Sequence, residues 1–118
     1  MRQLAMASLA ACALLLAACG EPLPKERLDY AGEWEAAQVY LLITPAGRCV
    51  YERHRDSGKV SIDAPIKGFE GDNFLVGVGP LTTTFVVTKR PALVDGKWKM
   101  TVDGVELTRV SSPGEVRT

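Results

Sequence analysis

Hydrophobic and polar positions alternate through most of the chain after about residue 28. The clearest case is the stretch 97–107, where apolar side chains at every second position would share one face of a β-hairpin. Asp103-Gly104 at its centre favours a two-residue type I′ turn, because both turn residues need a positive φ. The same period of two predicts further strands at residues 39–43, 49–52, 60–64 and 84–88.

Turn-forming residues separate these stretches at intervals of about 8 to 12 positions, which is typical of all-β domains. We therefore expect one β domain over residues 28–110, a small antiparallel barrel or sandwich of about seven to eight short strands. Its expected core contains Trp34, Leu41, Ile43, Phe85, Val87, Trp98, Met100, Val102 and Leu107.

Two stretches of this domain do not follow the simple alternation. Residues 73–78 are apolar throughout, which suggests a strand buried on both faces. Residues 33–38 contain good helix formers. The sequence therefore leaves open whether they form a short helix that leads into the first strand or an extended segment.

The first 18 residues break the pattern altogether. Arg2 precedes an apolar run from Leu4 to Leu16 that only Ser8 interrupts. About 13 such residues are too few to cross a bilayer core, which takes about 20. They match the hydrophobic region of a signal peptide, so residues 1–18 are expected to form a signal-peptide helix.

The end of this run carries a more specific motif. Leu16-Ala17-Ala18-Cys19-Gly20 resembles the lipobox of bacterial lipoproteins. The resemblance implies that Cys19 is the lipid-attachment residue: its sulfur receives a diacylglycerol, the chain is cut before it, and the new amino group is acylated. Several acyl chains together attach a protein stably to a membrane. Because Gly20 stands where an Asp favours inner-membrane retention in Gram-negative lipoproteins, we expect a periplasm-facing protein anchored in the outer membrane.

The segments flanking the domain are polar. Residues 19–27, from the lipidated cysteine onward, include Pro22 and Pro24 and predict a flexible linker. An arm packed on the domain through Leu23 or Leu28 is the alternative. Residues 111–118 are expected to form a flexible tail.

A second resemblance concerns the domain itself. Gly32-x-Trp34, just before the first expected strand, resembles the signature that opens lipocalin-like barrels. In that family the Trp closes one end of the barrel and packs against a basic residue from a late strand, a position that Arg109 matches. The resemblance implies a lipocalin-like barrel holding one small ligand at most. The stretches 62–76 and 98–107 are also similar to small uncharacterised bacterial lipoproteins. That resemblance carries no information about activity.

Composition narrows the possible partners. The chain has 14 Lys and Arg residues against 14 Asp and Glu residues, a formal net charge of zero. Nucleic-acid binding needs clustered positive charge, so we expect no such partner. With one His and no acidic run at ligand spacing, we expect neither a metal site nor a cofactor.

Cys49 and His54 are the candidate catalytic pair. They are separated by an odd number of positions, so on one regular strand they point to opposite faces and cannot meet. We therefore expect no catalytic residue. Cys49 is interpreted as a small buried hydrophobe, with an intermolecular disulfide or a reactive thiol as alternatives.

A basic cluster surrounds one expected hairpin and consists of Arg48, Arg53, Arg55 and Lys59. Acidic neighbours dilute it, which favours a solvated strand edge over a site for lipid headgroups or envelope phosphates.

These observations together predict a non-enzymatic envelope lipoprotein, held by membrane lipid through acylated Cys19, that binds envelope proteins or wall components. The alternative is a lipocalin-like carrier of a small apolar ligand in the barrel interior. A large internal cavity would favour the carrier, and a packed interior with an apolar surface patch would favour surface binding.

Overall fold

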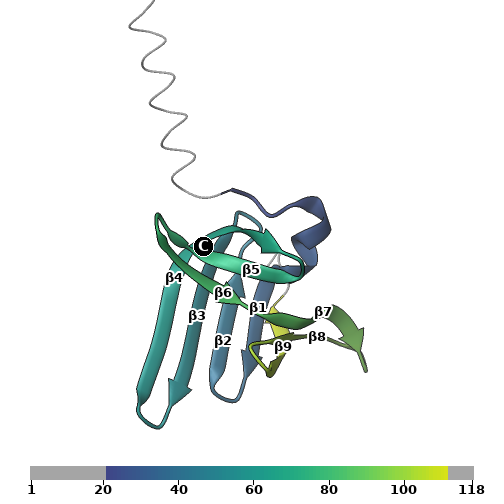
Figure 1. The fold of residues 1–118 in the computed structure, drawn as a ribbon. Coiled ribbons are helices and arrows are strands. Elements are labelled where there is room, and N and C mark those ends of the chain that lie inside the picture. The colour runs from purple at the N-terminus through teal and green to yellow at the C-terminus, as the bar shows by residue number, and fades with distance from the viewer. Residues whose placement is uncertain (1–20, 112–118) are drawn as a thin grey trace, which may run out of the picture.

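The computed structural model describes residues 21–111, so the expected signal peptide, Cys19 and residues 112–118 of the expected tail lie outside it. Within this range, the 3-10 helix η1 (Lys25–Tyr30) precedes nine antiparallel strands (Figure 1). The strands are β1 (Gly32–Ala36), β2 (Val39–Ile43), β3 (Arg48–Arg55), β4 (Gly58–Glu70), β5 (Asn73–Val78), β6 (Leu81–Phe85), β7 (Val87–Val94), β8 (Lys97–Val102) and β9 (Val105–Ser111).

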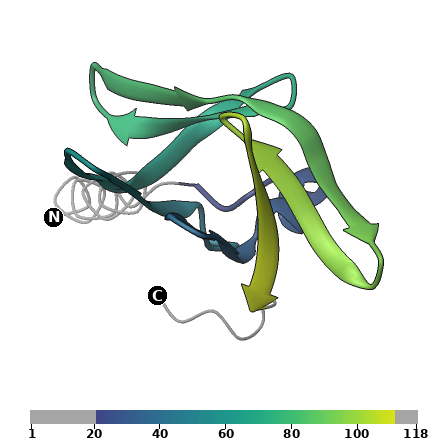
Figure 2. The same cartoon turned by 90° about the horizontal axis from the view of Figure 1, so that it is seen from below.

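The strands form one curled sheet with the order β6-β5-β4-β3-β2-β1-β9-β8-β7. Its two end strands, β6 and β7, are separated in sequence by Val86 alone, so the sheet curls round into a half-barrel (Figure 2). The expected all-β, antiparallel class is confirmed. The sheet has more strands than the seven to eight expected, because the extended chain from Leu81 to Val94 is divided at Val86 into two strands. Of these, β6 pairs with β5 and β7 pairs with β8.

The β8–β9 hairpin forms as the alternation predicted. Met100 lies opposite Leu107 and Val102 opposite Val105, so the apolar residues share one face. Asp103 has φ 47° and Gly104 has φ 79°, the positive values that a type I′ turn requires.

The structure decides one open alternative and corrects one expectation. Residues 33–36 belong to strand β1, not to a helix, because pairing with β2 places Trp34 opposite Leu41 and buries both. Sheet pairing here outweighs helix propensity. Strand β5 is buried on one face only: Phe74 and Val76 point into the core, whereas Leu75 between them is half-buried.

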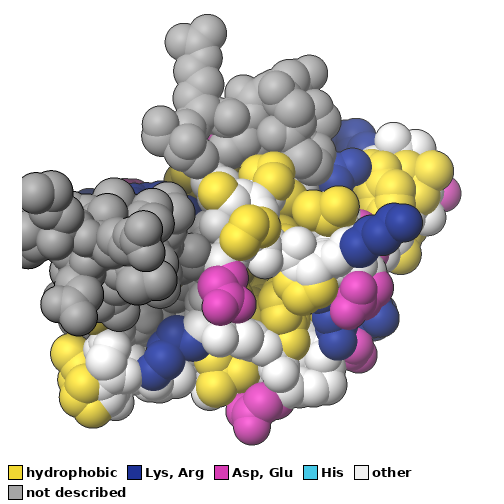
Figure 3. Space-filling model, turned by 90° about the horizontal axis from the view of Figure 1, so that it is seen from above, with side chains coloured by type: hydrophobic (Ala, Val, Ile, Leu, Met, Phe, Trp, Pro, Cys, Tyr) yellow, Lys and Arg dark blue, Asp and Glu magenta, His cyan; other side chains and the backbone are white. Residues whose placement is uncertain are grey.

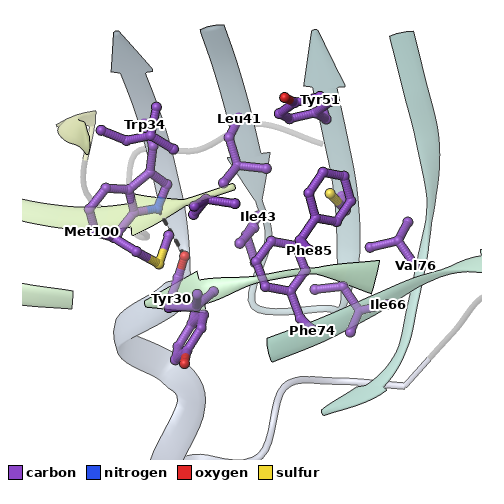
Figure 4. Packing of buried hydrophobic residues seen from close by; sticks show 14 of the residues in the cluster. Tyr30, Trp34, Leu41, Ile43, Tyr51, Ile66, Phe74, Val76, Phe85 and Met100 are labelled. Atoms are coloured by element: carbon purple, nitrogen blue, oxygen red, sulfur yellow. Dashed lines mark hydrogen bonds between the residues drawn. The ribbon is translucent and has the colours of Figure 1, made fainter. Parts of the chain in front are cut away.

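The core lies inside the curve of the sheet (Figure 4). The expected core residues are buried with one exception, Trp98, which is half-buried at its margin. Aromatic rings fill the centre: Phe74 stacks on Phe85 with 4.9 Å between ring centroids, and Tyr51 meets Phe85 edge-on at 4.8 Å.

The segment before η1 also packs on the sheet. Leu23 is 7% exposed, and its backbone N–H donates to the carbonyl of Pro45 at 2.9 Å. A Cβ at Gly47 would lie 2.0 Å from the carbonyl oxygen of Glu21, so the close approach requires glycine there. The described part of the 19–27 segment is therefore an arm packed on the domain, which corrects the expected flexible linker.

Candidate functional site

The end of the half-barrel that carries η1, called here the helix end, is closed by Trp34 and Arg109. The indole N–H of Trp34 donates to the Tyr30 carbonyl at 2.9 Å. The Arg109 guanidinium carbon lies 5.6 Å from the Trp34 ring centroid and 4.8 Å from that of Trp98. A Cβ at Gly32 would lie 2.7 Å from the Arg109 side chain. The structure thus brings together the three positions that the lipocalin resemblance singled out.

Tyr30 completes the closure from the other side. Its hydroxyl donates to the carbonyl of Asp72 at 2.8 Å, and its ring meets Phe69 and Phe74 edge-on. Burial raises the pKa of the Tyr30 hydroxyl, while the nearby Arg27 guanidinium opposes that rise. The helix end is therefore packed solid with aromatic and guanidinium groups.

The opposite end carries a shallow cleft, called here the distal cleft. It has a volume of about 260 Å³ and is lined by Ala36, Ala37, Gln38, Val39, Arg53 and Val105. The backbone N–H of His54 donates to the Gln38 carbonyl at 2.9 Å, which ties the β3–β4 hairpin to the β1–β2 turn. The cleft has small apolar walls and one cationic side chain, and it opens to solvent.

The structure divides the basic cluster between the two ends of β3. Arg48 lies at the start of the strand, where its guanidinium pairs with the Asp63 carboxylate at 2.6 Å. The remaining basic residues lie at the far tip of the β3–β4 hairpin, which projects beyond the rest of the sheet in Figure 1. This tip is called here the basic hairpin and comprises Arg53, His54, Arg55 and Lys59.

A second cleft, the lateral cleft, opens where β4 leaves β5. Residues 58–65 of β4 pair with β3, whereas pairing with β5 begins only at Ile66, so the two strands diverge. The cleft between them has a volume of about 350 Å³. Its lining combines apolar side chains, of which Val78 and Leu81 are 65% and 76% exposed, with polar ones such as Asp63 and Thr82, and it opens to solvent.

Cys49 and His54 are not brought together. Cys49 is fully buried, as expected, whereas His54 is exposed near the hairpin tip. Burial raises the pKa of the Cys49 thiol to about 12, and the Asp63 carboxylate adds to the rise. The thiol is therefore protonated at neutral pH, and a protonated thiol is a poor nucleophile.

Two further properties concern residues 21–111 only. In that range, no group of three or more His, Cys, Asp or Glu side chains is placed to hold a metal ion. No helix in the same range has the length and hydrophobicity to span a bilayer.

Sequence reasoning missed both clefts. Their lining residues come from turns and strands far apart in the chain, and only the curl of the sheet brings them together. Comparison with family models, with curated proteins and with solved structures found no match to this chain.

Proposed function

We propose that this chain is a non-enzymatic lipoprotein of the bacterial envelope, anchored in the outer membrane through acylated Cys19 and facing the periplasm. Its β domain binds an envelope protein or a wall component through its surface. The observation that carries this proposal is the filled interior. Trp34, Phe74 and Phe85 are at most 1% exposed and pack in contact with neighbouring aromatic or guanidinium groups, so binding is assigned to the outside.

The surface best suited to this role is the basic hairpin together with the distal cleft. Arg53 belongs to both, and with the exposed Arg55 and Lys59 it outweighs the neighbouring Glu52 and Asp56, so the hairpin keeps a net positive charge. Arginine side chains bind carboxylates and phosphates through paired hydrogen bonds. The partner group is therefore anionic, as the carboxylates of wall peptides or of an acidic envelope protein are.

Binding of the full lipidated chain to isolated cell-wall sacculi tests this assignment. The double variant Arg53→Gln/Arg55→Gln should weaken binding roughly tenfold, equivalent to about 1.4 kcal/mol, and reduce its salt dependence. Lys89→Gln/Lys97→Gln makes the same charge change on exposed residues of the β7–β8 hairpin and serves as the control. Equal losses from both variants would exclude the basic hairpin as the binding surface.

The alternative function is that of a lipocalin-like carrier of a small apolar ligand. Two observations favour it: Arg109 lies over the Trp34 ring, and the lateral cleft, which opens to solvent beside the filled interior, has a volume of about 350 Å³, within the range of roughly 300–1,000 Å³ found for ligand pockets. Native mass spectrometry of protein purified from membranes separates the two functions. A stoichiometric apolar ligand would support the carrier, and its absence would support surface binding.

A further inference from the structure

We propose that the domain rests directly on the membrane that holds its lipid, with the β5–β6 turn dipping into the headgroup layer. This inference rests on the proposed lipid attachment at Cys19. It adds an orientation and a second membrane contact, which the lipobox does not imply. The occupant assigned to this surface is the bilayer to which the chain is itself anchored.

The first step is the length of free chain. Glu21 already lies against Gly47, and Leu23 is buried and hydrogen-bonded to Pro45. Only Gly20 separates Cys19 from Glu21, so the connection from Cys19 to Glu21 spans at most about 7 Å. The headgroup layer on each side of a bilayer is itself about 5–8 Å thick. The surface around Glu21 must therefore lie at the lipid interface.

The second step connects that surface to the β5–β6 turn. Lys67 lines a small cleft of about 90 Å³ together with residues 21–24. Its ammonium group donates to the Gly79 carbonyl at 2.6 Å and to the Thr82 hydroxyl at 2.8 Å. The turn is thereby held beside the start of the described chain, at the upper edge of the half-barrel in Figure 1.

The third step is the chemistry of the turn. Val78 and Leu81 are 65% and 76% exposed, and Pro80 between them is exposed as well. Apolar side chains at such a tip gain free energy when they enter the headgroup and acyl boundary. The Lys67 ammonium beside them suits the phosphate of a lipid headgroup. Figure 3, which views the molecule from above, shows hydrophobic side chains on this side interspersed with Lys and Arg and with Asp and Glu.

The test uses the full lipidated chain in vesicles of phosphatidylethanolamine and phosphatidylglycerol that contain brominated lipid. A bimane fluorophore is attached to Leu81→Cys, and a matched control carries it at Leu93→Cys. Leu93 is 62% exposed but lies on the β7–β8 hairpin. Cys49 is buried and so does not take the label in the folded protein. We expect bromolipid to quench the label at position 81 at least about threefold more strongly than the label at position 93.

Two outcomes would overturn the inference in different ways. A wild-type chain that does not attach to vesicles contradicts the lipid anchor and this orientation together. A chain that attaches but shows equal quenching at positions 81 and 93 contradicts the orientation alone. Insertion of ten Gly and Ser residues between Gly20 and Glu21 should lower quenching at position 81 while the protein stays attached. Unchanged quenching would show that the short connection does not set the orientation.

Discussion

The two ends of strand β3 face very different surroundings. At the Arg48 end, the inward side chains of Cys49 and Tyr51 are buried against the core. Two and four positions after Tyr51, the inward positions are occupied by Arg53 and Arg55, and burial stops. A guanidinium cannot be buried without a partner except at a large free-energy cost.

The paired strand β4 shows the same change. Ile66 is 7% exposed, whereas Val60, opposite Arg53, is 42% exposed. Backbone pairing between β3 and β4 nevertheless continues to the hairpin tip. Hydrogen-bonded pairing thus sets how far a hairpin extends, while the chemistry of its inward positions sets how far the core extends. The remainder of the hairpin is left as free surface.

The largest expected effect separates the filled core from its margin. Trp34→Ala should lower the free energy of unfolding by about 3–5 kcal/mol, because the whole ring is buried and its removal leaves a cavity. Trp98→Ala should cost clearly less, since Trp98 is half-buried and lies at the edge of the core. Urea unfolding of both variants measures the difference, and equal losses would contradict the boundary of the core drawn here.

A smaller effect contrasts two arginines at opposite ends of the domain. Arg109→Gln should reduce stability by about 1–2 kcal/mol, because it removes a cation from the faces of Trp34 and Trp98. Arg53→Gln, at the distal cleft, should leave the unfolding midpoint nearly unchanged. If the two variants unfold at the same denaturant concentration, Arg109 does not help to close the helix end.

The smallest expected effect is a pH dependence. The pKa of the Cys49 thiol is about 12 in the folded protein against 9.0 for the free group, so burial favours the neutral form. Its contribution to stability is fully present below pH 9 and is lost as the pH rises toward 12. We expect a loss of about 1 kcal/mol by pH 10.

Cys49→Ala provides the control for this slope, because alanine does not titrate. Its stability, although lower overall, should fall less steeply between pH 8 and 10. The Tyr40 hydroxyl, whose pKa is also raised to about 12 by burial and by Glu33, contributes mainly above this range. An equal slope in wild type and Cys49→Ala would show that the thiol is not protected as the structure indicates.

Features set by short stretches of sequence could be predicted. The β8–β9 hairpin follows from strict alternation and from Asp103-Gly104, both of which act locally. The resemblance at Gly32-x-Trp34 points to Arg109, and the Arg109 side chain does lie over the Trp34 ring. Alternation also predicts Trp98 in the core, because it identifies a face but does not show where along that face the core ends.

Features set by distant contacts could not be predicted. The basic cluster looked compact because its members are close in sequence, yet an extended strand separates Arg48 from Arg55 by about 23 Å. Tyr30 was missed because it follows a polar segment and becomes buried only when η1 folds against Phe69 and Phe74. Residues 33–36 join β1 only because β2 and β9 are there to pair with them.

The pairing of β1 with β9 has a consequence for the order of events during folding. These are the first and last strands in chain order, so their contact closes a loop that includes nearly the whole domain. Contacts between such distant segments form slowly, because most of the chain entropy must be lost first. Because β9 is synthesised last, β1 has no partner on this edge until the whole domain has been made. The half-finished sheet therefore exposes β1 as an open edge that binding by a chaperone would protect from aggregation.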